Sequence, residues 1–197
     1  TQLTSLGVYS GVVANGNGNS NDASNINTTF LRGLQQTDGY GVAQFETIFP
    51  GHYTSRTINS QYVPLTEIEH SSLNCIKLTY TTILSHAANE TVRLQNNTIS
   101  GLYTSHASHV GQLFFDQDLI SQVEAVSPYN TNTQELTTNA EDSILAEEAD
   151  TIDPFVQYVF LGDDVQDGIF AWISLGIDAT EDSAITPAAY MTEDGGV

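Results

Sequence analysis

One stretch of the chain, from Phe30 to Gln61, decides how the remainder is interpreted. Its informative residues are Phe30-Leu31-Arg32-Gly33, Thr37-Asp38, Gly41, Phe45, Phe49-Pro50-Gly51-His52-Tyr53, Arg56, Asn59 and Gln61. The pattern predicts a strand over residues 29–34, a turn over 37–41, and a second strand over 42–49 that ends at Pro50-Gly51. Tyr53 and Arg56 follow this turn, so we expect an exposed tyrosine and an arginine to share a site at a strand end.

Short strands separated by turn residues account for most of the remaining chain. Side-chain alternation and apolar runs predict further strands over residues 6–14, 83–94, 110–115, 155–161 and 169–176. A short helix is expected over residues 119–126, and a helical turn or loop segment over 141–149. This pattern of elements predicts an all-β fold, a β-sandwich or barrel with short helices and loops, rather than alternating strands and helices. We expect one domain over residues 1–178, followed by a flexible acidic tail over 179–197.

The composition excludes several classes of protein. A chain of 197 residues with 40% hydrophobic residues can bury a core. The formal net charge of −20 includes 18 acidic residues from Asp116 onward and no Lys or Arg there, which disfavours nucleic acid and anionic membranes as partners. No apolar run reaches the roughly 18 residues of a membrane span. The one cysteine, Cys75, cannot form an internal disulfide.

Three glycosylation sequons favour a secreted protein. They begin at Asn27, Asn89 and Asn96, in a chain with four basic residues. The first residues lack the pattern of a signal peptide and do not include Met, so we expect that an N-terminal part has been removed. The sequence therefore predicts an extracellular protein whose signal peptide is not in this chain.

Two tyrosines are the candidates for chemistry. Tyr9 lies between Gly7 and Gly11, and Tyr53 lies three residues before Arg56. A phenol that loses its proton binds hard ions such as ferric iron, and a nearby arginine can neutralise an anionic substrate. The plain alternative is that both are ordinary, half-buried tyrosines. Sequence motifs of common hydrolases and phosphate loops are absent.

Longer motifs resemble a known enzyme family. They are residues 7–15 (Gly-Val-Tyr-Ser-Gly-Val-Val-Ala-Asn), the stretch from Phe30 to Arg56, Val110-Gly111-Gln112-Leu113-Phe114-Phe115-Asp116, and Ala171-Trp172-Ile173. This set resembles the intradiol ring-cleavage dioxygenases, and most of all their extracellular fungal branch, which is related to protocatechuate and catechol dioxygenases. The resemblance covers residues 7–58 and about 83–178.

The resemblance implies a β-sandwich with a non-haem Fe(3+) site held by two Tyr and two His. Tyr9 and Tyr53 align with the tyrosine ligands, and Tyr53 also with the residue that takes a substrate proton. Arg56 aligns with the residue that stabilises charge on the substrate, and Gln112 with a glutamine that lines its pocket. The implied reaction cleaves a small aromatic diol between its hydroxyl-bearing carbons with dioxygen.

The chain departs from the family pattern at the two histidine ligands. Asn59 and Gln61 stand where Arg-x-x-His-x-His is expected, and neutral amide oxygens are poor ligands for ferric iron. Residues 59–79 also form an atypical insertion, which we interpret as the translation of a retained short intron. Other histidines are expected to be structural or to lie at the surface: His52, His70, His86, His106 and His109.

Two functions therefore remain open from sequence. The chain is an intradiol dioxygenase with an incomplete iron site, or a catalytically inactive secreted β-sandwich that binds aromatic ligands or nothing. The sequence does not select one catechol as the substrate. Because the expected N-terminal strands are missing, we expect an exposed sheet edge and association into a homo-oligomer.

Overall fold

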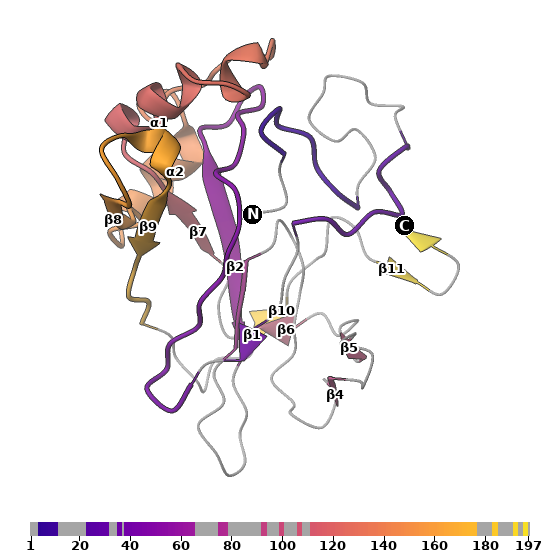
Figure 1. The fold of residues 1–197 in the computed structure, drawn as a ribbon. Coiled ribbons are helices and arrows are strands. Elements are labelled where there is room, and N and C mark those ends of the chain that lie inside the picture. The colour runs from indigo at the N-terminus through magenta and orange to yellow at the C-terminus, as the bar shows by residue number, and fades with distance from the viewer. Residues whose placement is uncertain are drawn as a thin grey trace.

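The described part of the protein contains short strands that pair antiparallel, two short α-helices, two 3₁₀ helices and connecting loops (Figure 1). The computed structural model describes residues 4–11, 23–31, 35–36, 38–65, 75–78, 92–93, 99–100, 106–107, 111–176, 183–184, 191–192 and 195–196. The strands are β1 (Gln35–Gln36), β2 (Asn59–Leu65), β3 (Cys75–Leu78), β4 (Val92–Arg93), β5 (Ile99–Ser100), β6 (His106–Ala107), β7 (Gly111–Phe114), β8 (Gln157–Phe160), β9 (Ile169–Trp172), β10 (Ser183–Ala184), β11 (Met191–Thr192) and β12 (Gly195–Gly196).

The described helices lie between β7 and β9 in sequence. They are the α-helices α1 (Gln117–Glu124) and α2 (Ser143–Ala149) and the 3₁₀ helices η1 (Tyr129–Thr131) and η2 (Val165–Asp167). None of these helices is long and apolar enough to cross a membrane. In Figure 1 both α-helices lie with β8 and β9 at the end of β2 that β7 occupies.

The largest sheet has four strands in the order β1-β3-β2-β7, and every adjacent pair is antiparallel. Strand β2 pairs with β7 so that Asn59 lies opposite Phe114 and Gln61 opposite Gln112. Residues 59–79, which we predict to be an insertion, thus contribute β2 and β3 to this sheet. Their origin from a retained intron stays a prediction.

The core lies between the start of β2, helix α1 and the β8–β9 hairpin. Helix α1 begins after Asp116, whose carboxylate accepts a 2.8 Å hydrogen bond from the Leu119 amide and so caps the helix. Apolar residues of α1 spaced one turn apart face inward. The buried core residues are Ile58, Phe115, Leu119, Ile120, Val123 and Val156.

Two glycines allow the N-terminal segment to press against the Pro50–Tyr53 turn. A Cβ on Gly7 would lie 1.9 Å from the His52 carbonyl oxygen, and one on Gly51 would lie 2.3 Å from the Ser5 carbonyl oxygen. The Thr4 carbonyl accepts 3.0 Å hydrogen bonds from the amides of both glycines. Residues 4–8 are thereby held beside His52. This position of the N-terminal segment brings Tyr9 against Tyr53.

Several predicted elements are confirmed. Strands form within residues 110–115, 155–161 and 169–176. Helix α1 overlaps the segment predicted over 119–126 but begins two residues before it, and α2 lies within 141–149 and begins two residues after its start. Of the strand predicted over 83–94, β4 is described and most of the rest lies outside the described residues. The tail over 179–197 contains β10, β11 and β12, and its flexibility stays a prediction.

Three strand predictions near the N-terminus are wrong for the residues described. Gly7 and Gly11 have φ of 67° and 70°. These positive values interrupt the extended backbone predicted over 6–14 at both glycines. Leu31, with φ of 56°, lies in a turn instead of the strand over 29–34. Residues 42–49 keep a partial in–out alternation but form no ladder with a described strand. Alternation alone does not supply a pairing partner.

We predict that Gly7→Ala destabilises the protein by about 3 kcal/mol or more, because it adds both a left-handed backbone penalty and a clash with the His52 carbonyl. The matched control is Gly41→Ala, since Gly41 has φ of 78° but open space around its Cα. It should cost only about 1–2 kcal/mol. Chemical denaturation measures both free energies of unfolding, and equal losses would contradict the predicted close packing.

Candidate functional site

Tyr9 and Tyr53 lie against each other although 43 residues separate them in sequence. Their ring centroids are 5.0 Å apart and the rings meet edge to face at 73°. Both side chains are buried, with 4% and 7% of their surface exposed. The prediction of an exposed Tyr53 is therefore wrong, and the Tyr9 ring, which the N-terminal segment brings against it, covers part of its surface.

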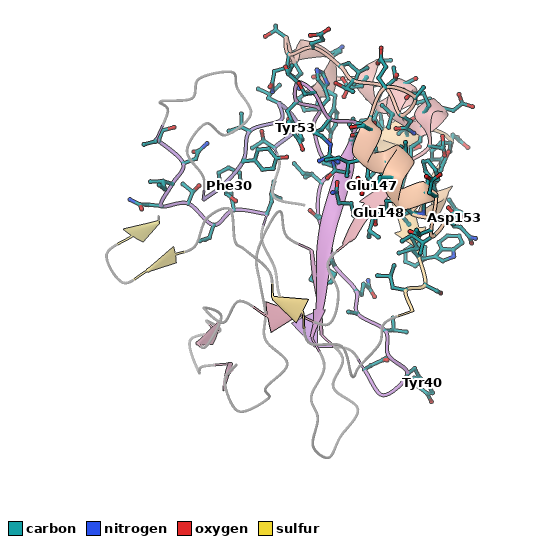
Figure 2. The ribbon with its side chains drawn as sticks, turned by 180° about the vertical axis from the view of Figure 1, so that it is seen from behind. Phe30, Tyr40, Tyr53, Glu147, Glu148 and Asp153 are labelled. Atoms are coloured by element: carbon teal, nitrogen blue, oxygen red, sulfur yellow. The ribbon has the colours of Figure 1, made fainter. Side chains whose placement is uncertain are left out.

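A tight turn connects Tyr53 to Arg56. The two residues form an isolated antiparallel bridge across Thr54 and Ser55, and Ser55 adopts a φ of 74°. Figure 2 shows Tyr53 beside the upper end of β2, with Glu147 and Glu148 of α2 across that strand from it. The turn thus places Arg56 next to Tyr53 of the buried tyrosine pair.

Two contacts hold the guanidinium of Arg56. Its Nε donates to Asp142 Oδ2 at 2.9 Å, and its Nη2 donates to Gln112 Oε1 at 2.5 Å. The Arg56 side chain is 14% exposed and that of Asp142 is 1% exposed. Arg56 and Gln112, two of the predicted catalytic residues, are therefore in direct contact.

The carboxylate of Asp142 joins this arginine to helix α2. Its Oδ1 accepts from the Ile144 and Leu145 amides at the helix start, at 2.9 and 3.0 Å, and Oδ2 also accepts from the Thr57 amide at 2.8 Å. Burial raises the pKa of Asp142, but the hydrogen bonds and the charge of Arg56 outweigh it and hold that pKa below the usual range. The carboxylate is ionised at neutral pH.

Helix α2 also contacts strand β7 through Glu148 in its last turn. Glu148 Oε1 accepts a 3.0 Å hydrogen bond from the backbone amide of Gln112. Burial raises the pKa of Glu148 above its ordinary value, against the opposing effects of this hydrogen bond and of the Arg56 charge. Asp142 and Glu148 therefore hold Arg56 and Gln112 from the two ends of one helix.

His52 serves the fold and is not available as a metal ligand. Its Nε2 lies 3.0 Å from the Gln134 carbonyl oxygen, and its Nδ1 forms a 2.9 Å ion pair with Glu124 Oε1. Burial lowers the pKa of His52, but Glu124 and the carbonyl outweigh this effect and raise it above its usual value. Because both neighbours are acceptors, the imidazolium form fits them.

The described residues fit a ferric iron site only in part. Tyr9 and Tyr53 supply two adjacent phenols, but the buried Asn59 uses its amide nitrogen to donate to the Thr57 carbonyl at 2.8 Å. Gln61 lies on β2 opposite Gln112, and its side chain is outside the described residues. His70, His86 and His109 also fall outside them, and only the backbone of His106 is described, in β6. No cluster of three His, Cys, Asp or Glu able to hold a metal occurs in the described part of the chain.

Sequence reasoning missed the residues that support this site. Asp142 and Glu148 contact Arg56 and Gln112 from α2, and Asn139 accepts a 2.5 Å hydrogen bond from the Thr57 hydroxyl. The signal for Asp142 was present, because an aspartate directly before an apolar-periodic segment marks a helix start. Its contact with an arginine 86 positions earlier has no local signal.

Comparisons of the chain with protein families, curated proteins and solved structures found no match.

We predict that His52 titrates above 6.5, and that Glu124→Gln lowers its pKa by removing the carboxylate. The raised pKa stabilises the fold fully below pH 6.5, and this stabilisation is lost as the pH rises through the folded pKa. Proton NMR of the imidazole in both variants measures the pKa, with denaturation as a function of pH measuring stability. A His52 pKa below 6.5 in the wild type would rule out the ion pair.

Proposed function

We propose that this protein is intradiol dioxygenase-like and that Tyr9, Tyr53, Arg56 and Gln112 form the diol-binding part of its site. The observation that carries the proposal is the buried contact between Tyr9 and Tyr53, whose ring centroids lie 5.0 Å apart. The resemblance to the family assigns these two tyrosines, from separate segments, to one site. The spacing of the two tyrosines in the sequence does not pair them, so their contact supports the role that the resemblance gives them.

The contact between Arg56 and Gln112 is a second, independent support. The resemblance places both residues at the substrate, and their side chains meet at 2.5 Å from segments 56 residues apart. A fixed guanidinium is suited to stabilising negative charge on the oxygens of a catechol-type diol, and a glutamine amide adds orientation. The substrates proposed are a small aromatic diol and dioxygen.

Iron is part of this proposal only to the extent that the residues fit it. Tyr9 and Tyr53 are the proposed ligands of Fe(3+), and Asn59 and Gln61 leave the donor set incomplete. This incomplete donor set does not support an iron-dependent chemical step in this chain. Ring cleavage between the two hydroxyl-bearing carbons, as an oxidoreductase of aromatic catabolism, requires nitrogen ligands that the described residues do not offer.

A catalytically inactive protein is the second candidate, and Asn59 favours it. This residue stands at a ligand position, is 2% exposed, and donates its side-chain amide to the Thr57 carbonyl just before β2. An amide so engaged serves the fold. In this case the protein is a secreted module that binds aromatic ligands without cleaving them.

The remaining proposals concern fold, location and assembly. We propose that the strands complete a β-sandwich of the family type, that the protein is extracellular, and that it associates into homo-oligomers. Asn27, the acceptor of the first sequon, is exposed at a turn, as glycosylation requires. Exposed large apolar side chains on the β8–β9 hairpin, such as Phe170 at 51% and Trp172 at 42%, support association.

We predict that the wild-type protein mixed with excess ferric iron develops a visible tyrosinate charge-transfer band that a chelator removes readily. Asn59→His/Gln61→His should retain the band against the same chelator, because imidazole completes the donor set. Absorption spectroscopy measures the band, and an oxygen electrode measures uptake with catechol.

The control is Tyr9→Phe in the double-histidine background, which should lose the band. Oxygen uptake by the wild type would contradict the inactive alternative. A colourless double-histidine variant that folds normally would contradict the proposed iron ligands.

A further inference from the structure

We propose that Asp142 is the positioning residue of the site: it orients the guanidinium of Arg56 and, through it, the bound diol. This inference rests on the function proposed above, because it concerns the same site. It adds to Arg56 and Gln112 a residue that none of the motifs quoted for the family resemblance contains. The two oxygens of its carboxylate bind different parts of the chain.

The Asp142 carboxylate divides its oxygens between two tasks. Oδ1 caps helix α2 by accepting from the Ile144 and Leu145 amides. Oδ2 accepts from the Arg56 Nε at 2.9 Å and from the Thr57 amide at 2.8 Å. Because the cap fixes the carboxylate to the helix, the second oxygen is a rigid anchor for the segment that follows Tyr53.

Two anchors determine the plane of the guanidinium. The Asp142 carboxylate accepts a hydrogen bond from Nε, and the Gln112 side chain on β7 accepts one from Nη2. A planar group held at two points by different elements cannot rotate about its long axis. These contacts use two of its five N–H donors. Three N–H donors remain beyond these two contacts, and 14% of the Arg56 side-chain surface is exposed.

Neighbouring bonds restrict the anchor further. Asn139, three residues before Asp142, accepts from the Thr57 hydroxyl at 2.5 Å and donates to the Phe115 carbonyl at 2.9 Å. The loop that precedes α2 is thus bonded to both the Arg56 segment and the end of β7. Asp142 cannot shift without disturbing the positions of Arg56 and Gln112 relative to each other.

A purely structural role for Asp142 is the alternative, and the chain contains a matched control for it. Asp116 caps α1 through a 2.8 Å bond from Leu119, in the same way as Asp142 caps α2, but the arginine contact is particular to Asp142. Serine is a good helix cap but is too short to hold both a helix start and a guanidinium. Asp142→Ser therefore removes the contacts with Arg56 and with the Thr57 amide and retains the cap. Asp116→Ser changes the cap of α1 and the hydrogen bond of Asp116 with Tyr158, and it leaves the two contacts of the Arg56 guanidinium in place.

The test uses nitrocatechol as the diol and the full chain without added metal. An absorbance titration measures its dissociation constant, and ¹⁵N NMR follows solvent exchange of the Arg56 Nε–H, assigned with Arg56→Lys. We expect Asp142→Ser to weaken nitrocatechol binding about tenfold, the effect of losing one charge-assisted hydrogen bond, and to speed Nε–H exchange. Asp116→Ser should leave both quantities unchanged.

A double variant separates positioning from a general loss of structure. If Asp142 acts through Arg56, then Asp142→Ser/Arg56→Lys binds nitrocatechol no more weakly than Arg56→Lys alone. Arg56→Lys by itself keeps the charge but loses the Nε contact, so it reports the same interaction if Asp142→Ser fails to fold, and it should also weaken binding about tenfold.

Unchanged nitrocatechol affinity in both Asp142→Ser and Arg56→Lys would overturn the inference. Losses of binding free energy that add in the double variant would also overturn it. If the wild type binds no nitrocatechol but its Nε–H exchange is slow and becomes fast in Asp142→Ser, the proposed function fails while the positioning of Arg56 stands.

Discussion

The buried carboxylate of Asp142 is the interaction on which the rest of the site depends. One oxygen caps the start of helix α2. The other accepts hydrogen bonds from Arg56 and from the Thr57 amide, which lie 86 and 85 positions earlier in the chain. Removing one partner of such a buried pair typically costs about 3–5 kcal/mol, because the other charge stays buried. The pair therefore joins the helical part of the chain to the strand β2, which begins three residues after Arg56.

Close packing at two glycines provides the other half of the site. Gly7 and Gly51 let residues 4–8 lie against His52, and this approach brings Tyr9 to Tyr53. The ion pair between His52 and Glu124 then connects the same turn to helix α1. The tyrosine pair and the arginine are thus held by different contacts, and the tight turn at Ser55 joins them. Their arrangement follows from the fold of three separate segments.

Part of this arrangement could be predicted from the sequence, for local reasons. Helix α1 is marked by Asp116 and by apolar residues one turn apart, and β7 by an apolar run. The pairing of Tyr9 with Tyr53 was predicted through a family resemblance, since spacing alone left them as ordinary tyrosines. The burial of Tyr53, the missing ladder over residues 42–49 and the role of Asp142 depend on distant segments, so no local pattern reports them.

The central claim is that the tyrosine pair and Arg56 belong to one site for a catechol-type diol. A crystal structure of the protein grown with nitrocatechol tests it most directly. The account predicts the aromatic ring between Tyr53 and the Arg56–Gln112 pair, with a phenol oxygen within hydrogen-bond distance of the guanidinium. Tyr9 and Tyr53 packed solely as core residues, with nitrocatechol absent from Arg56 at saturating concentration, would contradict it.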